Sequence, residues 1–325
     1  MTEKPTVLFI VGPTASGKTD AAVHAALKLN GEVISADSIQ IYRGLDKGSA
    51  KPTEEEKRGI KHHLIDIVDY TREDYNVACF LKDAAETIED IVKRGKMPIV
   101  AGGTGLYVNS LLYPLTFTEV KPDPKLREEL LQKETERTGT LYERLKECDP
   151  ESAARLHPND LKRIVRALEV YILTGRTITE QGGDFLNSRE NDIPFIPIIA
   201  GINMDRALLY ERINKRVDMM LKNGLSYEAL ELYERARRKQ VLSLQAIGYK
   251  QFIAYYEGLA TYDETVELIK RDTRRFAKRQ ISWFKRDKRI RWFCLDEYAS
   301  KEALNEAILD YFVKELACID RLGKD

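Results

Sequence analysis

VLFIVGPTASGKTD, residues 7–20, is the stretch that decides the fold. Five apolar residues, 7–11, predict a short buried strand, and the alanines and leucines that follow at helical spacing predict a helix. Between them, Gly12 to Thr19 match the pattern G-x-x-x-x-G-K-[ST] at every fixed position. A strand, a glycine-rich loop and a helix in this order are typical of a phosphate-binding loop.

Each part of such a loop has a chemical role. Its glycines let backbone N–H groups converge on phosphate oxygens, and the following helix N-terminus favours an anion. Lys18 adds a positive charge, and the Thr19 hydroxyl is a candidate ligand for Mg²⁺. A glycine turn with a purely structural role is the alternative. The predicted phosphate-binding residues are Gly12, Pro13, Thr14, Ala15, Ser16, Gly17, Lys18 and Thr19.

Composition limits the class of protein. The chain has 325 residues, of which 43% are hydrophobic and 32% charged, enough for a large core. No apolar run approaches the roughly 20 residues of a transmembrane helix, and the first strand begins too early for a signal peptide. The four cysteines are widely spaced, which argues against a zinc site or a disulfide framework. We expect a cytoplasmic monomer.

Strands and helices alternate over roughly the first 110 residues, which predicts a parallel α/β sheet. Strands are expected at residues 32–36, 62–69 and 97–100, and an amphipathic helix at 78–94. Asp37 directly follows the first of these strands, and ligands bind at the carboxyl ends of parallel strands. Its carboxylate is therefore a candidate general base, metal ligand or helix cap.

The pattern becomes helical and highly charged after this predicted sheet. Prolines at 122 and 124 mark the change, and an apolar run near residue 195 returns as a strand. The expected fold class is α/β, a P-loop NTPase-like parallel sheet with flanking helices. We predict a P-loop α/β core over residues 1–120, a helical insertion domain over 121–192, and over 193–325 a return to the core with a helical, basic C-terminal region.

The net charge is zero, with 52 basic and 52 acidic residues, so only local patches can attract a charged partner. The most polarised stretch is 271–291, which holds ten basic residues against two acidic ones. Phe276, Trp283 and Phe284 lie among them. Arginines interleaved with aromatic residues indicate a phosphate backbone with bases to stack on. The alternative is a solvated face.

Further motifs accompany the loop in order along the chain. Together they resemble the tRNA dimethylallyltransferase (tRNA isopentenyl-diphosphate transferase) family, in its short bacterial type without a C-terminal zinc finger. The resemblance covers nearly the whole chain. The matching segments are 12–19, 34–38, 41–44, 50–52, 102–104, 106–107, 157–160, 248–249 and 278–284.

This resemblance implies transfer of a dimethylallyl group from dimethylallyl diphosphate to the exocyclic amine of the adenine 3′-adjacent to the tRNA anticodon. It implies Asp37 as the base, Lys18 and Arg216 as contacts of the diphosphate, and Mg²⁺ near Thr19. The implied partners are the tRNA anticodon stem-loop and the prenyl donor, with no membrane. The residues implied to face tRNA are Asp37, Ser38, Ile39, Gln40, Thr104, Arg127, Lys162, Arg163, Arg166, Gln245, Gly248, Lys250, Lys278, Arg279, Gln280, Trp283 and Lys285.

The implied chemistry suits these residue types. An allylic carbon becomes cation-like as diphosphate leaves, and Lys18, Arg216 and Mg²⁺ can stabilise the charge of the leaving group. An aromatic amine is a weak nucleophile, so a carboxylate that accepts its proton helps. The target base must be flipped out of its stack to reach a pocket.

Two other functions use the same loop. A small-molecule or nucleoside kinase would bind ATP there, but it leaves the basic stretch without a purpose. A non-catalytic RNA-binding ATPase needs a Walker B acid, and Leu64 to Asp66 resemble one only superficially. The loop reads phosphate oxygens alone, so it cannot by itself separate ATP from another diphosphate.

Overall fold

The computed structural model describes residues 4–72, 75–113, 120–180, 193–236 and 242–322. The chain divides into two compact units. The predicted insertion, residues 121–192, lies within the second of them. Unit one comprises Met1–Leu112 and Pro194–Asp325, and unit two comprises Tyr113–Ile193.

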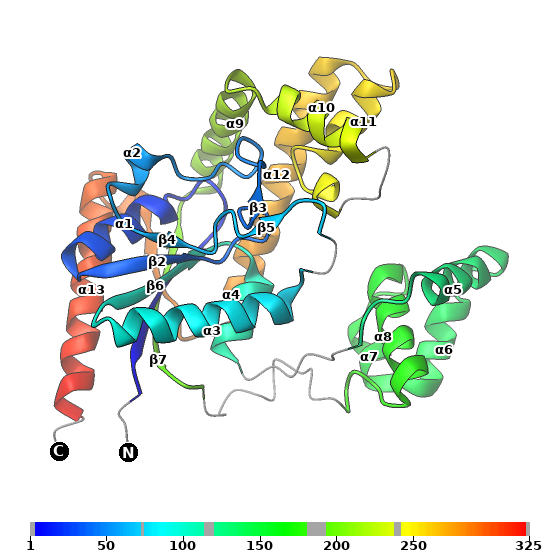
Figure 1. Cartoon of the computed structure of the whole chain (residues 1–325), viewed down its shortest axis with the longest axis horizontal. Helices are drawn as coiled ribbons and strands as arrows, with labels where there is room; N and C mark the ends of the chain where they lie inside the picture. Colours follow the sequence, from blue (N-terminus) through cyan, green and yellow to red (C-terminus); the bar gives the residue numbers. More distant parts are fainter. Residues whose placement is uncertain (1–3, 73–74, 114–119, 181–192, 237–241, 323–325) are drawn as a thin grey trace. The chain divides into compact units, whose positions relative to one another are not determined.

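Unit one is built on a parallel sheet. Its strands are β1 Thr6–Val11, β2 Gly31–Ser35, β4 His62–His63, β6 Met97–Gly102, β7 Ile196–Asn203 and β8 Arg291–Cys294. They form one six-stranded sheet in the order β4-β2-β6-β1-β7-β8 (Figure 1). Every neighbouring pair is parallel, which confirms the predicted α/β class. The strand that carries the phosphate-binding loop, β1, therefore lies inside the sheet.

Helices cover both faces of this sheet. The helices of the two layers are α1 Lys18–Lys28, α3 Val77–Lys93, α4 Gly105–Leu112 and α13 Lys301–Leu322. Leu8 and Ile10 of β1 share a buried core with the alanines of α1 and with Phe312 of α13. Successive strand residues point to opposite faces, so the other residues of β1 face the second layer. There, Phe80 of α3 stacks on Tyr107 of α4 with ring centroids 4.0 Å apart.

The remaining elements of unit one are mostly helical, as the sequence predicts. These elements are α2 Glu54–Lys57, α9 Arg206–Lys222, α10 Leu225–Ala236, η1 Leu242–Gln245, α11 Lys250–Tyr256, α12 Tyr262–Phe284 and η2 Leu295–Glu297. Two of them, α9 and α12, share a buried cluster with Ala15 of the loop that follows β1, at the carboxyl end of the sheet. A separate parallel pair is formed by β3 Tyr42–Arg43 and β5 Val68–Asp69.

Two expectations about strands are wrong. Residues 62–69 do not form one strand, because φ is 59° at Leu64 and 58° at Asp66, and the backbone turns between β4 and β5. No strand is predicted at β8, whose four residues begin at Arg291, the last residue of the basic stretch. A strand this short at the edge of a sheet has too few residues to show an alternating pattern.

Unit two is helical, in agreement with the sequence pattern. Its buried core includes Leu130, Leu141, and Ile164 with Leu168, which come from three different helices. The helices are α5 Pro124–Glu136, α6 Thr140–Cys148, α7 Pro150–Arg155 and α8 Leu161–Thr174. Among the described residues of the whole chain, no helix combines the length and apolarity needed to cross a membrane.

Candidate active site

The phosphate-binding loop leaves β1 at a position that only glycine can occupy. A Cβ at Gly12 would lie 2.4 Å from the carbonyl oxygen of Ile202. The backbone is also left-handed at Ala15 and Gly17, with φ of 63° and 100°. Gly17 precedes α1 without a side-chain cap. That arrangement leaves the first N–H groups of the helix suited to an anion.

Two side chains from later helices hold this loop in place. Gln280 of α12 accepts a hydrogen bond from Thr14 N at 2.9 Å and donates to Gly103 O at 2.8 Å. Arg212 of α9 donates from Nε to Ala15 O at 2.9 Å. Gln280 is only 6% exposed. Gln280 therefore supports the loop, and because it also lines the cavity, its contact with tRNA stays a prediction.

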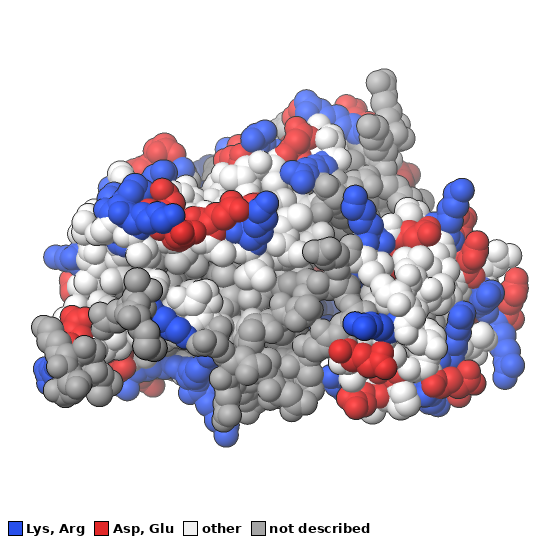
Figure 2. Space-filling view, turned by 60° about the horizontal axis from the view of Figure 1, so that its bottom comes forward, with Lys and Arg blue, Asp and Glu red and all other residues white. Residues whose placement is uncertain are grey.

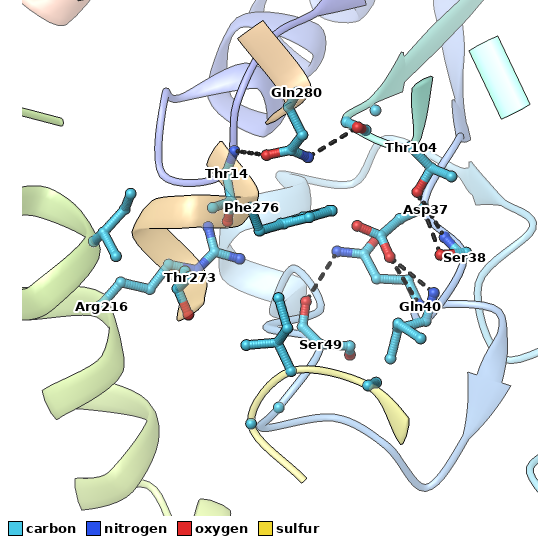
Figure 3. A pocket seen from close by; sticks show the side chains of 18 of the residues that line it. Thr14, Asp37, Ser38, Gln40, Ser49, Thr104, Arg216, Thr273, Phe276 and Gln280 are labelled. Atoms are coloured by element: carbon cyan, nitrogen blue, oxygen red, sulfur yellow. Dashed lines mark hydrogen bonds between the residues drawn. The ribbon is translucent and has the colours of Figure 1, made fainter. Parts of the chain in front are cut away.

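A cavity of about 380 Å³ lies beside the loop (Figure 3). It brings together the three residues predicted to carry the chemistry, Lys18, Asp37 and Arg216. One side is polar and comes from the loop and from the carboxyl ends of β2 and β6. The other side is apolar, and its residues from α9, α12 and the segment between them are Ile213, Val217, Met220, Ile247, Ile269 and Phe276.

The two oxygens of Asp37 have different surroundings. Oδ1 accepts hydrogen bonds from Ile39 N at 2.9 Å and Gln40 N at 3.3 Å, which fixes the turn after β2. Oδ2 has no hydrogen bond to any residue in the described part of the chain, and the carboxylate faces the cavity opposite Phe276 (Figure 3). In the described part of the chain no helix directly follows Asp37, so the carboxylate caps a turn and the helix-cap interpretation is wrong. The turn cap is compatible with a role as base, because each uses one oxygen.

The turn that carries Asp37 is joined to the end of β6. Ser38 N donates to Thr104 Oγ1 at 3.1 Å, and Thr104 N donates to Ala36 O at 3.2 Å. A Cβ at Gly102 would lie 2.3 Å from Ala36 O, so glycine is needed for this close approach. Asp37, Ser38 and Thr104, all predicted site residues, are thus set on rigid strand ends.

Two positive charges lie close together in the cavity, Lys18 from the loop and Arg216 from the otherwise largely apolar side formed by α9 and α12. Burial and the neighbouring Arg216 guanidinium lower the pKa of the Lys18 ammonium to about 7, and Asp37 offsets part of this effect. Lys18 Nζ donates to Pro13 O at 2.6 Å. Burial also lowers the pKa of Arg216, against the opposing effect of Asp37. Two crowded cations without a matching buried anion are typical of a site for a polyanionic ligand.

The helix α12 turns one face to the cavity and another to solvent. The residues that line the cavity follow helical spacing, and Arg279 lies at its rim beside Phe276, with the guanidinium carbon 5.8 Å from the ring centroid. Of the other predicted tRNA contacts, Gln245 and Gly248 line the cavity. Lys250, Lys278 and Lys285 are exposed. Trp283 packs on Gly105 of α4, where a Cβ would meet its ring at 2.4 Å.

Four predicted tRNA contacts lie in unit two. Arg127 donates to both oxygens of the buried Glu169 at 2.8 Å, and Arg166 donates to the same carboxylate at 2.6 Å. Burial raises the pKa of Glu169, but these hydrogen bonds outweigh it and lower the pKa. Both arginines therefore support the helices that carry them. Lys162 and Arg163 are exposed, and their contact with tRNA stays a prediction.

The described residues contain no cluster of three or more His, Cys, Asp or Glu that could hold a metal ion. The paired histidines of β4 both have partners within the protein. His63 Nε2 lies 2.7 Å from Glu32 Oε2, and His62 Nδ1 lies 2.9 Å from Ile60 O. Thr19, the predicted ligand of Mg²⁺, lines the cavity.

Several residues of the site carry no motif in the sequence. Met220 lines the cavity, whereas its neighbour Met219 is 61% exposed. Ile213 and Val217 also line the cavity, and in the sequence they belong to an apolar stripe along α9. A stripe of this kind looks the same whether it covers a core or a pocket. Arg212 could have been found from the Arg212 to Arg216 spacing, which places both on one helix face.

Comparisons with known proteins agree on one family. The IPP transferase family model matches residues 40–287, and the isopentenyl transferase model matches residues 5–71. A curated tRNA dimethylallyltransferase from Caldanaerobacter subterraneus subsp. tengcongensis is 47% identical over 95% of this chain and 98% of the relative.

Solved structures give the same result over the full fold. The full-length tRNA isopentenylpyrophosphate transferase from Bacillus halodurans is 38% identical and matches with a TM-score of 0.74, covering 99% of this chain and 100% of that one. A eukaryotic dimethylallyltransferase described as acting on tRNA is 30% identical, with a TM-score of 0.78 over 96% of this chain and 80% of its own.

Proposed function

The chain belongs to the tRNA dimethylallyltransferase (IPP transferase) family, and on this premise we propose that it transfers a dimethylallyl group from dimethylallyl diphosphate to the exocyclic amine of the adenine 3′-adjacent to the tRNA anticodon. The observation that carries the proposal is the cavity itself. One space holds a phosphate-binding loop, a carboxylate with an available oxygen, and an apolar side. The apolar side suits the dimethylallyl group of the donor.

The reaction exchanges one bond for another. The bond between the allylic carbon and the diphosphate oxygen breaks, and its electron pair leaves with the diphosphate. A bond forms between that carbon and the amine nitrogen, and the amine proton passes to Asp37 Oδ2. Lys18 and Arg216 stabilise the charge that develops on the leaving group. Because both cations are already in place, they need no reorganisation during the reaction.

The polar side of the cavity is compatible with Mg²⁺. This ion keeps several waters and is commonly bound through substrate phosphates and one or two protein oxygens. Thr19 would supply a hydroxyl, and the diphosphate would supply the remaining oxygens. The ion would add positive charge to the leaving group.

A product analysis tests this function. Two anticodon stem-loops are compared, one with adenine 3′-adjacent to the anticodon and one with guanine there. Each is incubated with the protein, Mg²⁺ and dimethylallyl diphosphate, and the nucleosides are examined by mass spectrometry. Prenylated adenosine is expected from the adenine substrate alone. No product, or equal product from both substrates, would contradict the proposal.

The exposed basic residues of α12 predict strongly salt-dependent tRNA binding. Acidic and basic side chains are interspersed over the face shown in Figure 2, so attraction must come from local groups. Binding should weaken steeply as salt rises, and Arg279→Ala should lower the log–log salt slope by roughly 0.7 to 0.9 for one lost phosphate contact. Binding titrations at several salt concentrations measure this slope.

A matched control is Arg321→Ala. Arg321 is exposed in the last turn of α13, which lies well away from α12 in Figure 1. Its replacement should leave the slope unchanged. A wild-type affinity that stays constant between low and moderate salt would return the basic stretch to the solvated-face interpretation.

The lowered pKa of Lys18 predicts a pH dependence of donor binding. In the protein without donor, the pKa of Lys18 is about 7. A bound diphosphate raises this pKa, because the anion favours the charged ammonium. Affinity is thus greatest below the free pKa and falls as pH rises toward the bound pKa, by up to about tenfold per pH unit. A phosphate monoester has its last pKa near about 6, so above about pH 7.5 the ligand's own charge is nearly constant.

Calorimetric titration with dimethylallyl diphosphate between about pH 7.5 and 9.5 measures this dependence. The fall in affinity should be accompanied by proton uptake. Lys18→Arg should remove most of both effects, because arginine stays charged over this range. An affinity that is constant or rises over this range in the wild-type protein would show that Lys18 is not the titrating contact.

A further inference from the structure

A surface loop forms the part of the cavity wall nearest Gln40. This wall loop, residues 45–50, contributes Gly48 and Ser49 to the cavity lining. Gln40 Nε2 donates to Ser49 O and Ala50 O, each at 3.4 Å. Gln40 N in turn donates to Asp37 Oδ1. The wall loop and the turn that carries the base are therefore joined through one residue, Gln40, whose side chain binds the loop and whose backbone N–H binds Asp37.

A carboxylate from α10 holds the wall loop from outside. Glu228 Oε2 accepts a hydrogen bond from Asp46 N at 2.9 Å, and Oε1 accepts one from Gly48 N at 3.0 Å. Lys47 N donates to both oxygens, at 3.0 and 2.9 Å. Three consecutive backbone N–H groups converge on one anion in this way. Such a concave arrangement binds anions in many proteins, and here the anion is a side chain of the protein itself.

The same carboxylate binds the neighbouring part of the wall. Tyr249, whose side chain is fully buried, donates from its hydroxyl to Glu228 Oε1 at 2.7 Å. Its ring packs against Gly48, where a Cβ would lie 2.3 Å from Cζ. Gly248 and the residues just before it line the cavity. Glu228 thus joins two segments of the wall that are about 200 positions apart in the sequence.

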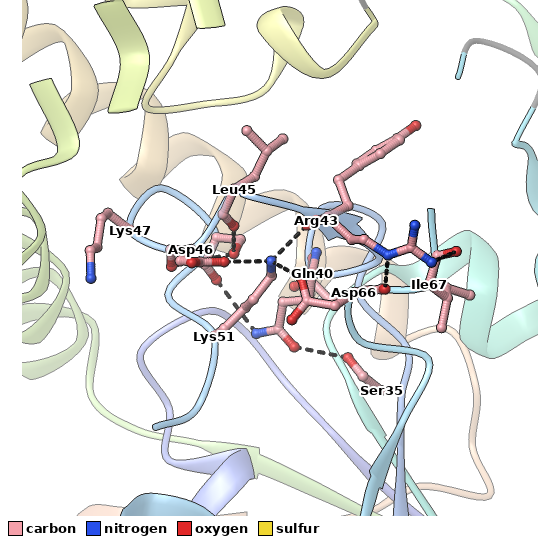
Figure 4. A network of polar contacts seen from close by, with 12 residues as sticks. Ser35, Gln40, Arg43, Leu45, Asp46, Lys47, Lys51, Asp66 and Ile67 are labelled. Atoms are coloured by element: carbon pink, nitrogen blue, oxygen red, sulfur yellow. Dashed lines mark hydrogen bonds and ion pairs between the residues drawn. The ribbon is translucent and has the colours of Figure 1, made fainter. Parts of the chain in front are cut away.

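Lys51, which directly follows the wall loop, holds the side chain of Asp46 at the start of that loop (Figure 4). Its Nζ donates to Tyr42 O at 2.6 Å and to Asp46 Oδ1 at 2.7 Å, and it also pairs with Asp66. The Lys51 side chain is only 7% exposed. With this end held, the three N–H groups on Glu228 determine where Gly48 and Ser49 lie in the cavity.

From these contacts we propose that Glu228 is a positioning residue for the acceptor side of the reaction. Its carboxylate sets the wall loop against residues 245–249, and through Gln40 it sets the orientation of the Asp37 turn toward the incoming base. The proposal rests on the proposed function. The donor side is supported separately, since Gln280 and Arg212 hold the phosphate-binding loop and neither bonds to the wall loop.

The test is Glu228→Gln, which keeps the size of the side chain. A glutamine places an NH₂ group where one carboxylate oxygen accepted N–H bonds, so two donors face each other. A shift of about 1 Å in the wall can lower the rate about a hundredfold, and we expect kcat with the stem-loop substrate to fall by about tenfold to a hundredfold. The dissociation constant for dimethylallyl diphosphate should stay within about twofold, because it depends on Lys18 and the phosphate-binding loop.

Three further measurements separate positioning from general loss of structure. Glu234→Gln makes the same chemical change on the exposed face of α10 and should behave as wild type. Tyr249→Phe removes one hydrogen bond to Glu228 and should lower kcat in the same direction but less. In Glu228→Ala, added formate can occupy the vacated N–H groups and should restore part of the activity in a saturable manner.

Wild-type kcat from Glu228→Gln would overturn the inference. So would a loss of donor affinity that parallels the loss of kcat, or an absence of rescue by formate together with wild-type behaviour of Tyr249→Phe. The proposed function is tested independently, because the wild-type protein alone must form prenylated adenosine. If it does not, the function fails whatever the variants do.

Discussion

Replacing Asp37 by asparagine is expected to lower the turnover number by about two to four orders of magnitude, the usual contribution of a general base. The substitution is well suited to this site. Asparagine Oδ1 can still accept the hydrogen bonds from Ile39 N and Gln40 N that fix the turn. Only the capacity of the second oxygen to accept a proton is lost. Single-turnover rates with stem-loop substrate measure the effect, and tRNA affinity should change little.

Asp69→Asn is the matched control. Asp69 also accepts a hydrogen bond from the backbone two residues later, Thr71 N at 2.9 Å, but it is exposed and does not line the cavity. Its replacement should leave turnover unchanged. Near-normal turnover in Asp37→Asn would leave Asp37 with the capping role alone.

Lys18→Ala is expected to reduce product formation by about three orders of magnitude or more. Removing a single preorganised donor to a developing oxyanion costs about a hundredfold to a thousandfold, and Lys18 carries a full charge beside the leaving group. Arg216 is left as the remaining cation of the pair. Because the predicted tRNA contacts lie on other elements, tRNA affinity should stay close to wild type.

Lys28→Ala serves as the control for Lys18. Both lysines are on α1, but Lys28 is exposed in its last turn, at the opposite end from the phosphate-binding loop. The control should keep full activity and stability. Substantial product from Lys18→Ala would show that the leaving diphosphate is stabilised elsewhere.

Local patterns were sufficient to predict the core of the fold. The phosphate-binding loop requires a strand before it and a helix after it, and β1 and α1 occupy those places. Buried runs of five or six residues likewise gave β2 and β6. The sheet order and the edge strand β8 could not be predicted this way, because they depend on contacts between segments far apart in the chain.

The site was predictable where one motif fixes a residue's position, as for Lys18 and Asp37, which do line one cavity. It was not predictable where several helices meet. Ile269, Thr273, Phe276 and Gln280 recur at helical spacing on α12 and line the cavity. Charged residues surround these four in the sequence, so the face of α12 that lines the cavity could not be recognised from the sequence pattern.

Supporting contacts were the least visible in the sequence. Nothing near Glu228 shows that it accepts three N–H groups from a loop about 180 positions earlier. An isolated glutamate on an amphipathic helix is ordinarily a solvated residue. Its role follows only from the folded arrangement.

The choice of donor tests the central claim most directly. The protein is supplied with tRNA and Mg²⁺ and with either dimethylallyl diphosphate or ATP, and both the nucleosides and the nucleotide are analysed. We expect prenylated adenosine with dimethylallyl diphosphate alone, and ATP neither required nor consumed. Hydrolysis of ATP or transfer of its phosphoryl group, with no prenylated adenosine from either mixture, would contradict the proposed prenyl transfer and support the kinase interpretation.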